Sequence, residues 1–269
     1  MLFYKYQGAG NDFIMLDNTD LAFDDLLADS KLVERLCHRR YGVGADGLIA
    51  LEKSDKPNHH FRMRYFNSDG LEGSMCGNGG RCAVAFAHFL NPNSPKQILF
   101  DAVDGQHSAI ILEDNRVELG MIDVNTIEEV APKKTFFLNT GSPHYVSFVE
   151  NLAQTPVVEE GKAIRYSSFY ANQGGTNVNF IEVDTNTQTL HIRTYERGVE
   201  DETYACGTGA VASAMAWATV NNWIGLIHVN LIAQGGKLGV KFERTEDNQF
   251  KNVALTGNTL QVFSGQLAL

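Results

Sequence analysis

The chain carries one cysteine motif twice, and this internal repeat constrains its fold more than any other feature of the sequence. Around Cys76 the chain reads SMCGNGGRCAVAFA, and around Cys206 it reads YACGTGAVASAMA. In both copies Gly-x-Gly follows the cysteine, and then comes a run of small and apolar residues that is typical of a buried helix. The cysteines lie 130 positions apart. A motif used twice at such a spacing indicates a fold of two similar halves.

Three further short clusters recur in the same order in both halves of the chain. The paired segments are 10–14 with 141–145, 44–47 with 174–177, and 66–67 with 196–197. The first pair is offset by 131 positions and the other two by 130, so one pair matches with a one-residue slip. Four clusters in the same order favour two domains of one ancestral design. We expect an N-terminal half over 1–117, completed by a final strand over 258–269, and a C-terminal half over 118–257.

Local patterns predict an α+β fold in both halves. Apolar residues at helical spacing predict a helix over Asp24–Arg39. Asp69-Gly70 and Asp104-Gly105 suit hairpin turns. Alternating or β-branched segments predict strands at Phe61–Phe66, Ser108–Leu112, Phe180–Val183 and Leu190–Tyr195. We expect two pseudo-symmetric domains, each a mixed sheet wrapped around the central helix that follows its cysteine, with the active site in the cleft between them.

Charge and composition exclude several classes of partner. The formal net charge is -10 and no block of Lys or Arg stands out, which argues against nucleic-acid and anionic-membrane surfaces. The start of the chain lacks the features of a signal peptide, and the longest apolar stretch, Ala210–Val220, is too short to span a bilayer. Four cysteines in 269 residues do not form a disulfide framework. We expect a cytoplasmic protein with reduced thiols.

Two of the four cysteines are candidates for chemistry. A thiol at a helix N-terminus faces unpaired N–H groups and the positive end of the helix dipole, which lowers a thiol pKa. Cys76 and Cys206 meet this condition because each begins its helix, whereas Cys37 and Cys82 lie within helical segments and are expected to be core residues. The spacing Cys76-x5-Cys82 matches no common zinc ligand pair, so no metal is expected.

Backbone and side-chain groups near the cysteines are candidates for ligand binding. Gly77-Asn78 and Gly207-Thr208 can present backbone N–H donors to a carboxylate. The alternative is that each Gly-x-Gly segment is a tight turn that only starts its helix. The Lys and Ser or Thr of a phosphate loop are missing.

Several isolated polar residues admit both a structural and a functional interpretation. Three asparagines at turn signals are either turn formers or ligand contacts: Asn11, Asn67 and Asn177. Glu196-Arg197 is either a surface ion pair or a pair that meets an ammonium and a carboxylate. His144 is either a plain loop histidine or a group that tunes a nearby thiol.

Two opposed thiols suit one kind of reaction. Inversion of a stereocentre by proton exchange needs a base on one face and an acid on the other, and a thiolate with a thiol provides both without a cofactor. Paired helix N-termini would stabilise the enolate-like charge that develops on an amino-acid carboxylate.

Three segments, GAGNDF, MCGNGGRC and ERGVEDETYACGTG, resemble the diaminopimelate epimerase family, and the resemblance spans nearly the whole chain. It implies a PLP-independent, metal-free, typically dimeric enzyme that interconverts LL- and meso-2,6-diaminopimelate for lysine and peptidoglycan synthesis. By this resemblance Cys76 and Cys206 exchange the proton, and His144 and Glu196 influence their pKa values. The implied substrate-binding residues are Asn11, Asn67, Gly77, Asn78, Asn177, Glu196, Arg197, Gly207 and Thr208.

The chain departs from the family pattern at two positions of the expected site. Ser142 stands where an Asn usually precedes Pro-His, and Gly47 stands where a Gln is common. One rival function is a racemase of the same fold that acts on proline, hydroxyproline or histidine. Arg197 argues against it, because proline has no distal carboxylate to pair with a guanidinium. A second rival is a non-catalytic amino-acid-binding protein, which would need no thiols.

Overall fold

The computed structural model describes residues 1–114, 116–131 and 134–268, and the chain divides into two compact units. Unit 1 comprises Met1–Leu119 with Gly257–Leu269, and unit 2 comprises Gly120–Thr256. The sequence places the two divisions after residues 117 and 257, whereas the units divide after residues 119 and 256.

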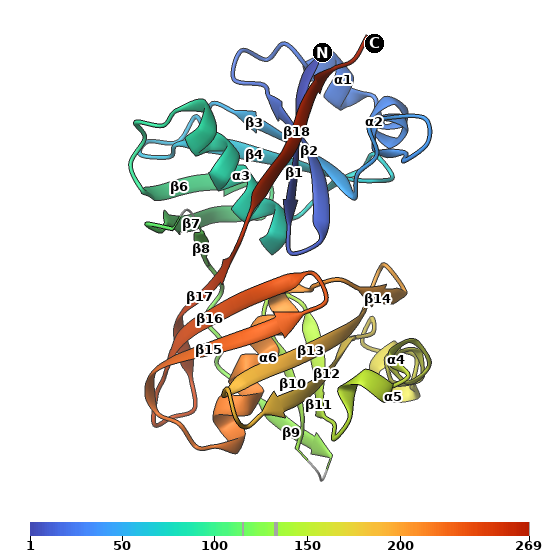
Figure 1. Ribbon diagram of the computed structural model, residues 1–269, viewed down its shortest axis with the longest axis vertical. Helices are drawn as coiled ribbons and strands as arrows, with labels where there is room; N and C mark the ends of the chain where they lie inside the picture. Colours follow the sequence, from blue (N-terminus) through green and yellow to red (C-terminus); the bar gives the residue numbers. More distant parts are fainter. Residues whose placement is uncertain (115, 132–133, 269) are drawn as a thin grey trace. The chain divides into compact units, whose positions relative to one another are not determined.

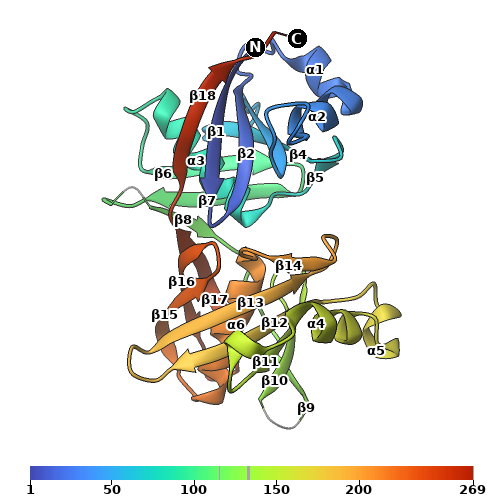
Figure 2. The same ribbon diagram turned by 45° about the vertical axis from the view of Figure 1, so that its right-hand side comes forward.

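Unit 1 is a mixed sheet with one long helix (Figure 1). Its elements are β1 Leu2–Gly8, β2 Asn11–Asp17, α1 Asp24–Ala28, α2 Ser30–Cys37, β3 Gly47–Glu52, β4 Phe61–Asn67, β5 Glu72–Gly73, α3 Gly77–Leu90, β6 Gln97–Ala102, β7 Gly105–Ile111, β8 Val117–Gly120 and β18 Leu260–Gln266. The β2–β3 and β4–β6 pairs are parallel, and β1–β2, β3–β4, β4–β5, β6–β7 and β7–β8 are antiparallel. The last strand, β18, runs antiparallel beside β1 (Figure 2).

Unit 2 repeats this connectivity. Its elements are β9 Glu128–Ala131, β10 Thr135–Asn139, β11 Pro143–Phe148, η1 Leu152–Gln154, α4 Val157–Arg165, α5 Ser168–Ala171, β12 Asn177–Asp184, β13 Thr189–Glu196, β14 Asp201–Thr203, α6 Gly207–Val220, β15 Gly225–Ala233, β16 Gly236–Arg244 and β17 Phe250–Gly257. The β11–β12 and β13–β15 pairs are parallel, and β10–β11, β12–β13, β13–β14 and β15–β16 are antiparallel. The order of parallel and antiparallel pairs matches that from β1 to β7, which confirms the predicted α+β fold with two pseudo-symmetric domains.

The helix after each cysteine is the central helix of its unit. Both α3 and α6 are 14 residues long, and α6 is buried on nearly every side. Small residues let the sheet approach closely. A Cβ built on Gly79 would lie 3.1 Å from Ile49 Cδ1 and 3.5 Å from Phe13 Cε1. Gly79 therefore allows α3 to lie close to the side chains of β2 and β3.

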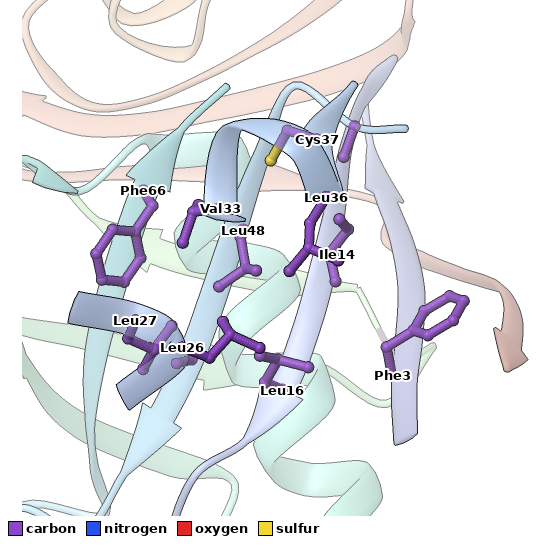
Figure 3. Close-up of a cluster of buried hydrophobic side chains, with 12 residues drawn as sticks. Phe3, Ile14, Leu16, Leu26, Leu27, Val33, Leu36, Cys37, Leu48 and Phe66 are labelled. Carbon is purple, nitrogen blue, oxygen red and sulfur yellow. The ribbon is translucent and has the colours of Figure 1, made fainter. Parts of the chain in front are cut away.

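The opposite face of the unit 1 sheet is covered by α1 and α2. Figure 3 shows Ile14 and Leu16 of β2 and Leu48 of β3 pointing toward the apolar side chains of these short helices. Alternation along a strand sends the intervening residues to the α3 face. Since all six residues of β3 are buried, this strand has apolar neighbours on both faces.

The single helix predicted over Asp24–Arg39 is wrong. The chain forms two helices because Asp29, with φ −95° and ψ 93°, leaves the helical region. Its carboxylate accepts hydrogen bonds from the N–H groups of Lys31 and Leu32, as an N-cap residue does. The second helix ends at Cys37, before Arg39. An aspartate inside an amphipathic segment therefore marked a new helix start, which apolar spacing alone did not reveal.

The other local predictions agree with the structure. The four predicted strands lie in β4, β7, β12 and β13, although β7 ends at Ile111 rather than Leu112. Asp69-Gly70 lies between the paired strands β4 and β5. Asp104 lies in the turn between the paired strands β6 and β7, and Gly105 is the first residue of β7. Within the described ranges, no helix combines the length and apolar character needed to cross a bilayer.

Candidate active site

Cys76 and Cys206 are the N-cap residues of the two central helices. Cys76 has φ −87° and ψ 131°, Cys206 has φ −112° and ψ 116°, and both conformations are extended. The first intrahelical bonds are donated to their carbonyl oxygens by Gly80 N over 2.7 Å and Ala210 N over 2.9 Å. The structure confirms that each of these cysteines begins its helix. Both thiols therefore lie at the positive end of a helix dipole.

Cys37 and Cys82 have a different environment. Both are buried, as predicted for core residues. Burial raises the pKa of each thiol to about 12, because a thiolate loses its hydration in an apolar surrounding. These two cysteines are therefore protonated near neutral pH.

A directional chain of hydrogen bonds surrounds the start of α3 in unit 1. The buried guanidinium of Arg81 donates to Asn78 Oδ1 over 2.7 Å. Asn78 Nδ2 donates to Asn11 Oδ1, and Asn11 Nδ2 donates to Asp46 Oδ2 over 3.1 Å. A donor-only group at one end and a carboxylate at the other fix the orientation of both amides. Asn11 and Asn78, two of the predicted binding residues, are thus held by each other.

The carboxylate end of this chain is anchored by charge. Arg39 pairs with Asp46 over 2.7 Å and with Asp12 over 2.7 Å, and Lys5 pairs with Asp12 over 2.7 Å. Burial opposes ionisation of Asp12, but hydrogen bonds from Arg39 and Lys5 hold its pKa well below the ordinary value. Four charged side chains therefore anchor the start of β2, where Asn11 lies.

Gly47 lies where the sheet has no space for a longer side chain. A Cβ on Gly47 would lie 2.5 Å from the backbone oxygen of Phe66 and 2.6 Å from Tyr65 Cε2. The ring of Tyr65 thus covers the Cα of Gly47 on this side of the sheet. Asn67, another predicted binding residue, is exposed at the end of β4, directly opposite Gly47 in the register.

Unit 2 builds its counterpart from two asparagines of β12. Asn177 Nδ2 donates to Pro143 O over 3.0 Å and to Ser142 Oγ over 3.2 Å. Its side-chain oxygen accepts from the backbone N–H of Arg197 over 2.9 Å. Asn177 thereby links the predicted site residue Arg197 to Ser142, a position that departs from the family pattern.

The buried imidazole of His144 connects this group to Cys206. Its Nε2 lies 2.9 Å from Thr208 Oγ1 and 3.0 Å from Ser142 Oγ, and Thr208 Oγ1 lies 3.4 Å from Cys206 Sγ. Burial, and then the positive charge of Arg197, lower the pKa of His144 to about 3. The imidazole is therefore neutral at physiological pH and reaches the thiol through one hydroxyl.

Glu196 and Arg197 follow one another at the end of β13. Glu196 Oε2 accepts a hydrogen bond from Thr203 Oγ1 over 2.7 Å. The Arg197 guanidinium donates to Gly174 O over 3.4 Å and is half-buried. Among the residues that the structure describes, this long contact is the hydrogen bond that the guanidinium makes, so it retains donors for a bidentate ligand such as a carboxylate.

The structure thus gathers the predicted residues into two local groups. In unit 1 the group contains Cys76, Gly77, Asn78 and Asn11, with Asn67 at the end of a strand of the same sheet. In unit 2 the group contains His144, Asn177, Glu196, Arg197, Cys206, Gly207 and Thr208.

Three residues that hydrogen-bond members of these groups were not predicted from the sequence: Arg81, Asn179 and Asp46. Arg81 is a charged residue inside an otherwise apolar helix, and that contrast was a usable signal. Asn179 follows Asn177 at a spacing of two, which places both side chains on one face of a strand. Asp46 lies in the recurring segment 44–47, but no role in binding or catalysis was predicted for it. In the ranges that the structure describes, no cluster of three or more His, Cys, Asp or Glu side chains is arranged to hold a metal. The predicted absence of a cofactor stays an expectation.

Comparison with solved structures identifies the fold. A phenazine biosynthesis protein of the PhzF family from Bacillus anthracis superposes with a TM-score of 0.78 at 14% identity, covering 100% of this chain and 99% of that one. A hydroxyproline epimerase from Agrobacterium vitis, with trans-4-hydroxy-L-proline bound, gives a TM-score of 0.69 at 14% identity and covers 100% and 91%. At such identities the likeness is one of fold.

Comparison of sequences identifies the family. The model of the family described as diaminopimelate epimerase matches residues 3–127 and 136–259. A diaminopimelate epimerase from Flavobacterium psychrophilum is 49% identical over 98% of both chains. One from Hydrogenobaculum sp. is 39% identical, covering 100% of this chain and 99% of its own. With matches of this extent, and with both cysteines at the starts of equivalent helices, the chain belongs to the diaminopimelate epimerase family and is an isomerase.

Proposed function

We propose that this enzyme converts LL-2,6-diaminopimelate to meso-2,6-diaminopimelate by proton exchange between two cysteines. One of Cys76 and Cys206 removes the α-proton as a thiolate, and the other returns a proton to the opposite face as a thiol. Neither PLP nor a metal takes part. The identity to curated diaminopimelate epimerases supports the substrate.

One observation carries the proposal. The two cysteines are N-caps of α3 and α6, which hold equivalent positions in two units of the same topology. Two thiols in equivalent settings suit a reaction that runs through a nearly symmetric, planar carbanion. The backbone N–H groups at the two helix starts, Gly77-Asn78 and Gly207-Thr208, are the proposed donors for the carboxylate on which negative charge develops.

The remaining polar residues have separable roles in this proposal. Arg197 binds the distal carboxylate with its unused donors, and Glu196 binds an ammonium group of the substrate. Asn11, Asn67 and Asn177 orient the amino-acid groups through their amides. His144 and Glu196 tune the thiols.

Family membership also supports a proposal about the oligomeric state, the compartment and the pathway of the enzyme. We propose that the enzyme works as a homodimer in the cytoplasm and supplies precursors of lysine and peptidoglycan. A reaction that needs a free thiolate requires a reducing compartment, which is consistent with the cytoplasm. No part of this setting involves a nucleic acid or a membrane.

The deciding experiment is incubation with LL-diaminopimelate in deuterated water. We expect a meso product with deuterium at the inverted α-carbon, because the returning proton comes from a thiol that exchanges with solvent. Proline, hydroxyproline and histidine serve as parallel substrates. If one of these is racemised faster than diaminopimelate, the proposed substrate is wrong and the two-thiol mechanism stands. Binding of diaminopimelate, with no α-deuterium incorporated into any of the four compounds, would instead support a non-catalytic binding protein.

A further inference from the structure

Two asparagines of β12 have amide orientations that the backbone determines. Asn179 Nδ2 lies 3.0 Å from Tyr145 O, and a carbonyl oxygen can only accept, so the nitrogen of this amide must face it. Asn177 is fixed in the same way by Pro143 O on one side and Arg197 N on the other. Both asparagines are buried, and alternation along the strand turns both side chains to one face.

The fixed amide of Asn179 determines the tautomer of His144. The second hydrogen of Asn179 Nδ2 points to His144 Nδ1 over 3.0 Å, while Thr194 Oγ1 donates to Asn179 Oδ1 over 3.0 Å. A ring nitrogen that accepts a hydrogen bond carries no proton, and a neutral imidazole has one N–H. The proton of His144 is therefore on Nε2, and it points to Thr208 Oγ1 and Ser142 Oγ.

This tautomer leaves the hydroxyl hydrogen of Thr208 available to sulfur. Thr208 Oγ1 accepts from His144, so its own hydrogen can be donated to a Cys206 thiolate over 3.4 Å. Ser142 Oγ, which accepts from Asn177, lies 3.2 Å from Thr208 Oγ1 and can donate to it. With the other tautomer, Nε2 would be an acceptor, and the hydrogen of Thr208 would turn away from sulfur to meet it.

The same fixed orientations of Asn177, Asn179 and His144 are compatible with a protonated Cys206 thiol. When Cys206 carries its proton, the S–H donates to Thr208 Oγ1, and the hydroxyl of Thr208 turns to donate to Ser142. The imidazole and both amides keep their orientations, so only two hydroxyl groups rotate. This arrangement of hydrogen bonds suits a cysteine that acts as a base in one direction of a reaction and as an acid in the other.

We propose that Asn179 is a positioning residue that locks His144 in the Nε2–H tautomer, so that Thr208 hydrogen-bonds Cys206 in both of its protonation states. The proposal rests on the proposed function for its catalytic meaning, but its structural content concerns the ligand-free protein alone. It excludes His144 as the base that deprotonates Cys206 through Thr208, because Nε2, the ring nitrogen that contacts Thr208 Oγ1, already carries the proton. The charged group that acts on this imidazole is Arg197, which disfavours its second protonation.

The tautomer can be measured directly in the native protein. The full chain is labelled with ¹⁵N-histidine, and the His144 signals are identified by their loss in His144→Gln. We expect the coupling pattern of a protonated Nε2 and a bare Nδ1 near neutral pH. A protonated Nδ1 would overturn the proposal. The result does not depend on which substrate the enzyme uses.

The role of the Thr208 hydroxyl is tested by the rate at which iodoacetamide alkylates Cys206, followed by peptide mass spectrometry. A hydrogen bond to a thiolate lowers its pKa by about one to two pH units, and the lower nucleophilicity offsets about half of the effect on rate. We therefore expect alkylation about three- to tenfold slower in Thr208→Val, and Thr208→Ser within about twofold of native. Equal alkylation rates for Thr208→Val and the native protein would show that the Thr208 hydroxyl does not hydrogen-bond the Cys206 thiolate, and would overturn the proposal.

Asn179 itself is tested by substitution with aspartate. An ionised aspartate has nearly the same shape as asparagine, but it accepts hydrogen bonds and cannot donate them. We expect the His144 signals to show a protonated Nδ1, because a carboxylate draws a proton to that nitrogen. An unchanged tautomer in a folded Asn179→Asp variant would show that Asn179 does not set it. If this variant fails to fold, the native spectrum and the Thr208 pair still decide the proposal.

Discussion

The guanidinium of Arg81 donates through Nη2 to the side-chain oxygen of Asn78 over 2.7 Å, and both side chains are buried in the first turns of α3. Its other hydrogen-bond partner among the described residues is the backbone oxygen of Gly77 over 3.3 Å, so both partners are uncharged. Burial lowers the pKa of Arg81, and the neighbouring thiols Cys82 and Cys76 oppose this shift. The charge of Arg81 is thus coupled electrostatically to the sulfur of Cys76, at the start of the same helix.

Replacing Arg81 with methionine should separate stability from activity. A buried charge is costly to desolvate, so we expect a melting temperature equal to or above that of the native protein. Loss of a charge-assisted bond worth about 1.5–3 kcal/mol releases Asn78, and epimerisation should fall at least about tenfold. The control is Arg62→Met, at an exposed position of β4. Unchanged turnover in Arg81→Met would leave this guanidinium with a structural role only.

The four cysteines should divide into two classes. Cys76→Ala and Cys206→Ala should each abolish inversion of LL-diaminopimelate, because neither thiol can reach both faces of the α-carbon. The matched controls are Cys37→Ala and Cys82→Ala, which remove buried thiols and should keep the activity at a cost of about 1 kcal/mol in stability. Turnover is measured by meso product formation, and unfolding by urea titration. Full inversion by either single variant of the first class would rule out the two-cysteine mechanism.

Arg197→Lys should weaken recognition of the distal carboxylate. A guanidinium binds a carboxylate through two parallel hydrogen bonds, which an ammonium cannot reproduce. Steady-state kinetics with diaminopimelate should show kcat/KM lower by at least about tenfold, since about 1.4 kcal/mol corresponds to one decade. The control is Arg193→Lys. Arg193 lies in β13, the strand that Arg197 follows, and pairs with Glu202 over 2.7 Å. An equal loss in both variants would point to a general effect on β13.

Gly47→Ala should destabilise the protein although it adds one methyl group. The new Cβ would lie 2.5 Å from the backbone oxygen of Phe66, which cannot move without disturbing the β3–β4 pair. Overpacking of this kind costs about 1–3 kcal/mol. In Gly239→Ala, another strand glycine, the methyl group would make an ordinary contact with Thr256 Cβ at 3.7 Å, and the loss should be smaller. Urea unfolding of both variants gives the comparison.

The buried imidazole should make the native protein less stable in mild acid. The pKa of His144 is about 3 in the folded chain and about 6.5 in the unfolded chain, so the unfolded state binds more protons between these values. Stability from this group is therefore present above pH 6.5 and is lost as the pH falls toward 3.

This loss can be separated from the titration of carboxylates. Asp12 and Glu200 have lowered pKa values, so their contribution fades only as the pH falls through their unfolded values near 4. Between pH 6.5 and 5 we expect the unfolding free energy of native protein to fall more steeply than that of His144→Gln. His228→Gln, at an exposed position of β15, is the control and should follow the native curve.

Several features of this protein were determined by short-range sequence. The Cys-Gly-x-Gly segments followed by small residues predicted where α3 and α6 begin, because a helix start depends on groups within one turn of it. The repeat at a spacing of 130 predicted the duplicated architecture for the same reason, since equal local patterns form equal elements. Asp29 is the exception on this scale: its side chain split one predicted helix into two.

The site itself depended on tertiary structure. The orientation of Asn179 is set by Tyr145, 34 positions earlier, and Asn11 is held by Asn78, 67 positions later. Whether Gly47 has room for a side chain depends on Tyr65 from the neighbouring strand. A sequence supplies donors and acceptors, but hydrogen bonds require their atoms within about 3 Å and at defined angles. Strand pairing decides which of these groups meet. Residue types were therefore enough to predict the kind of chemistry, whereas the fold was needed to determine which nitrogen of His144 carries the proton.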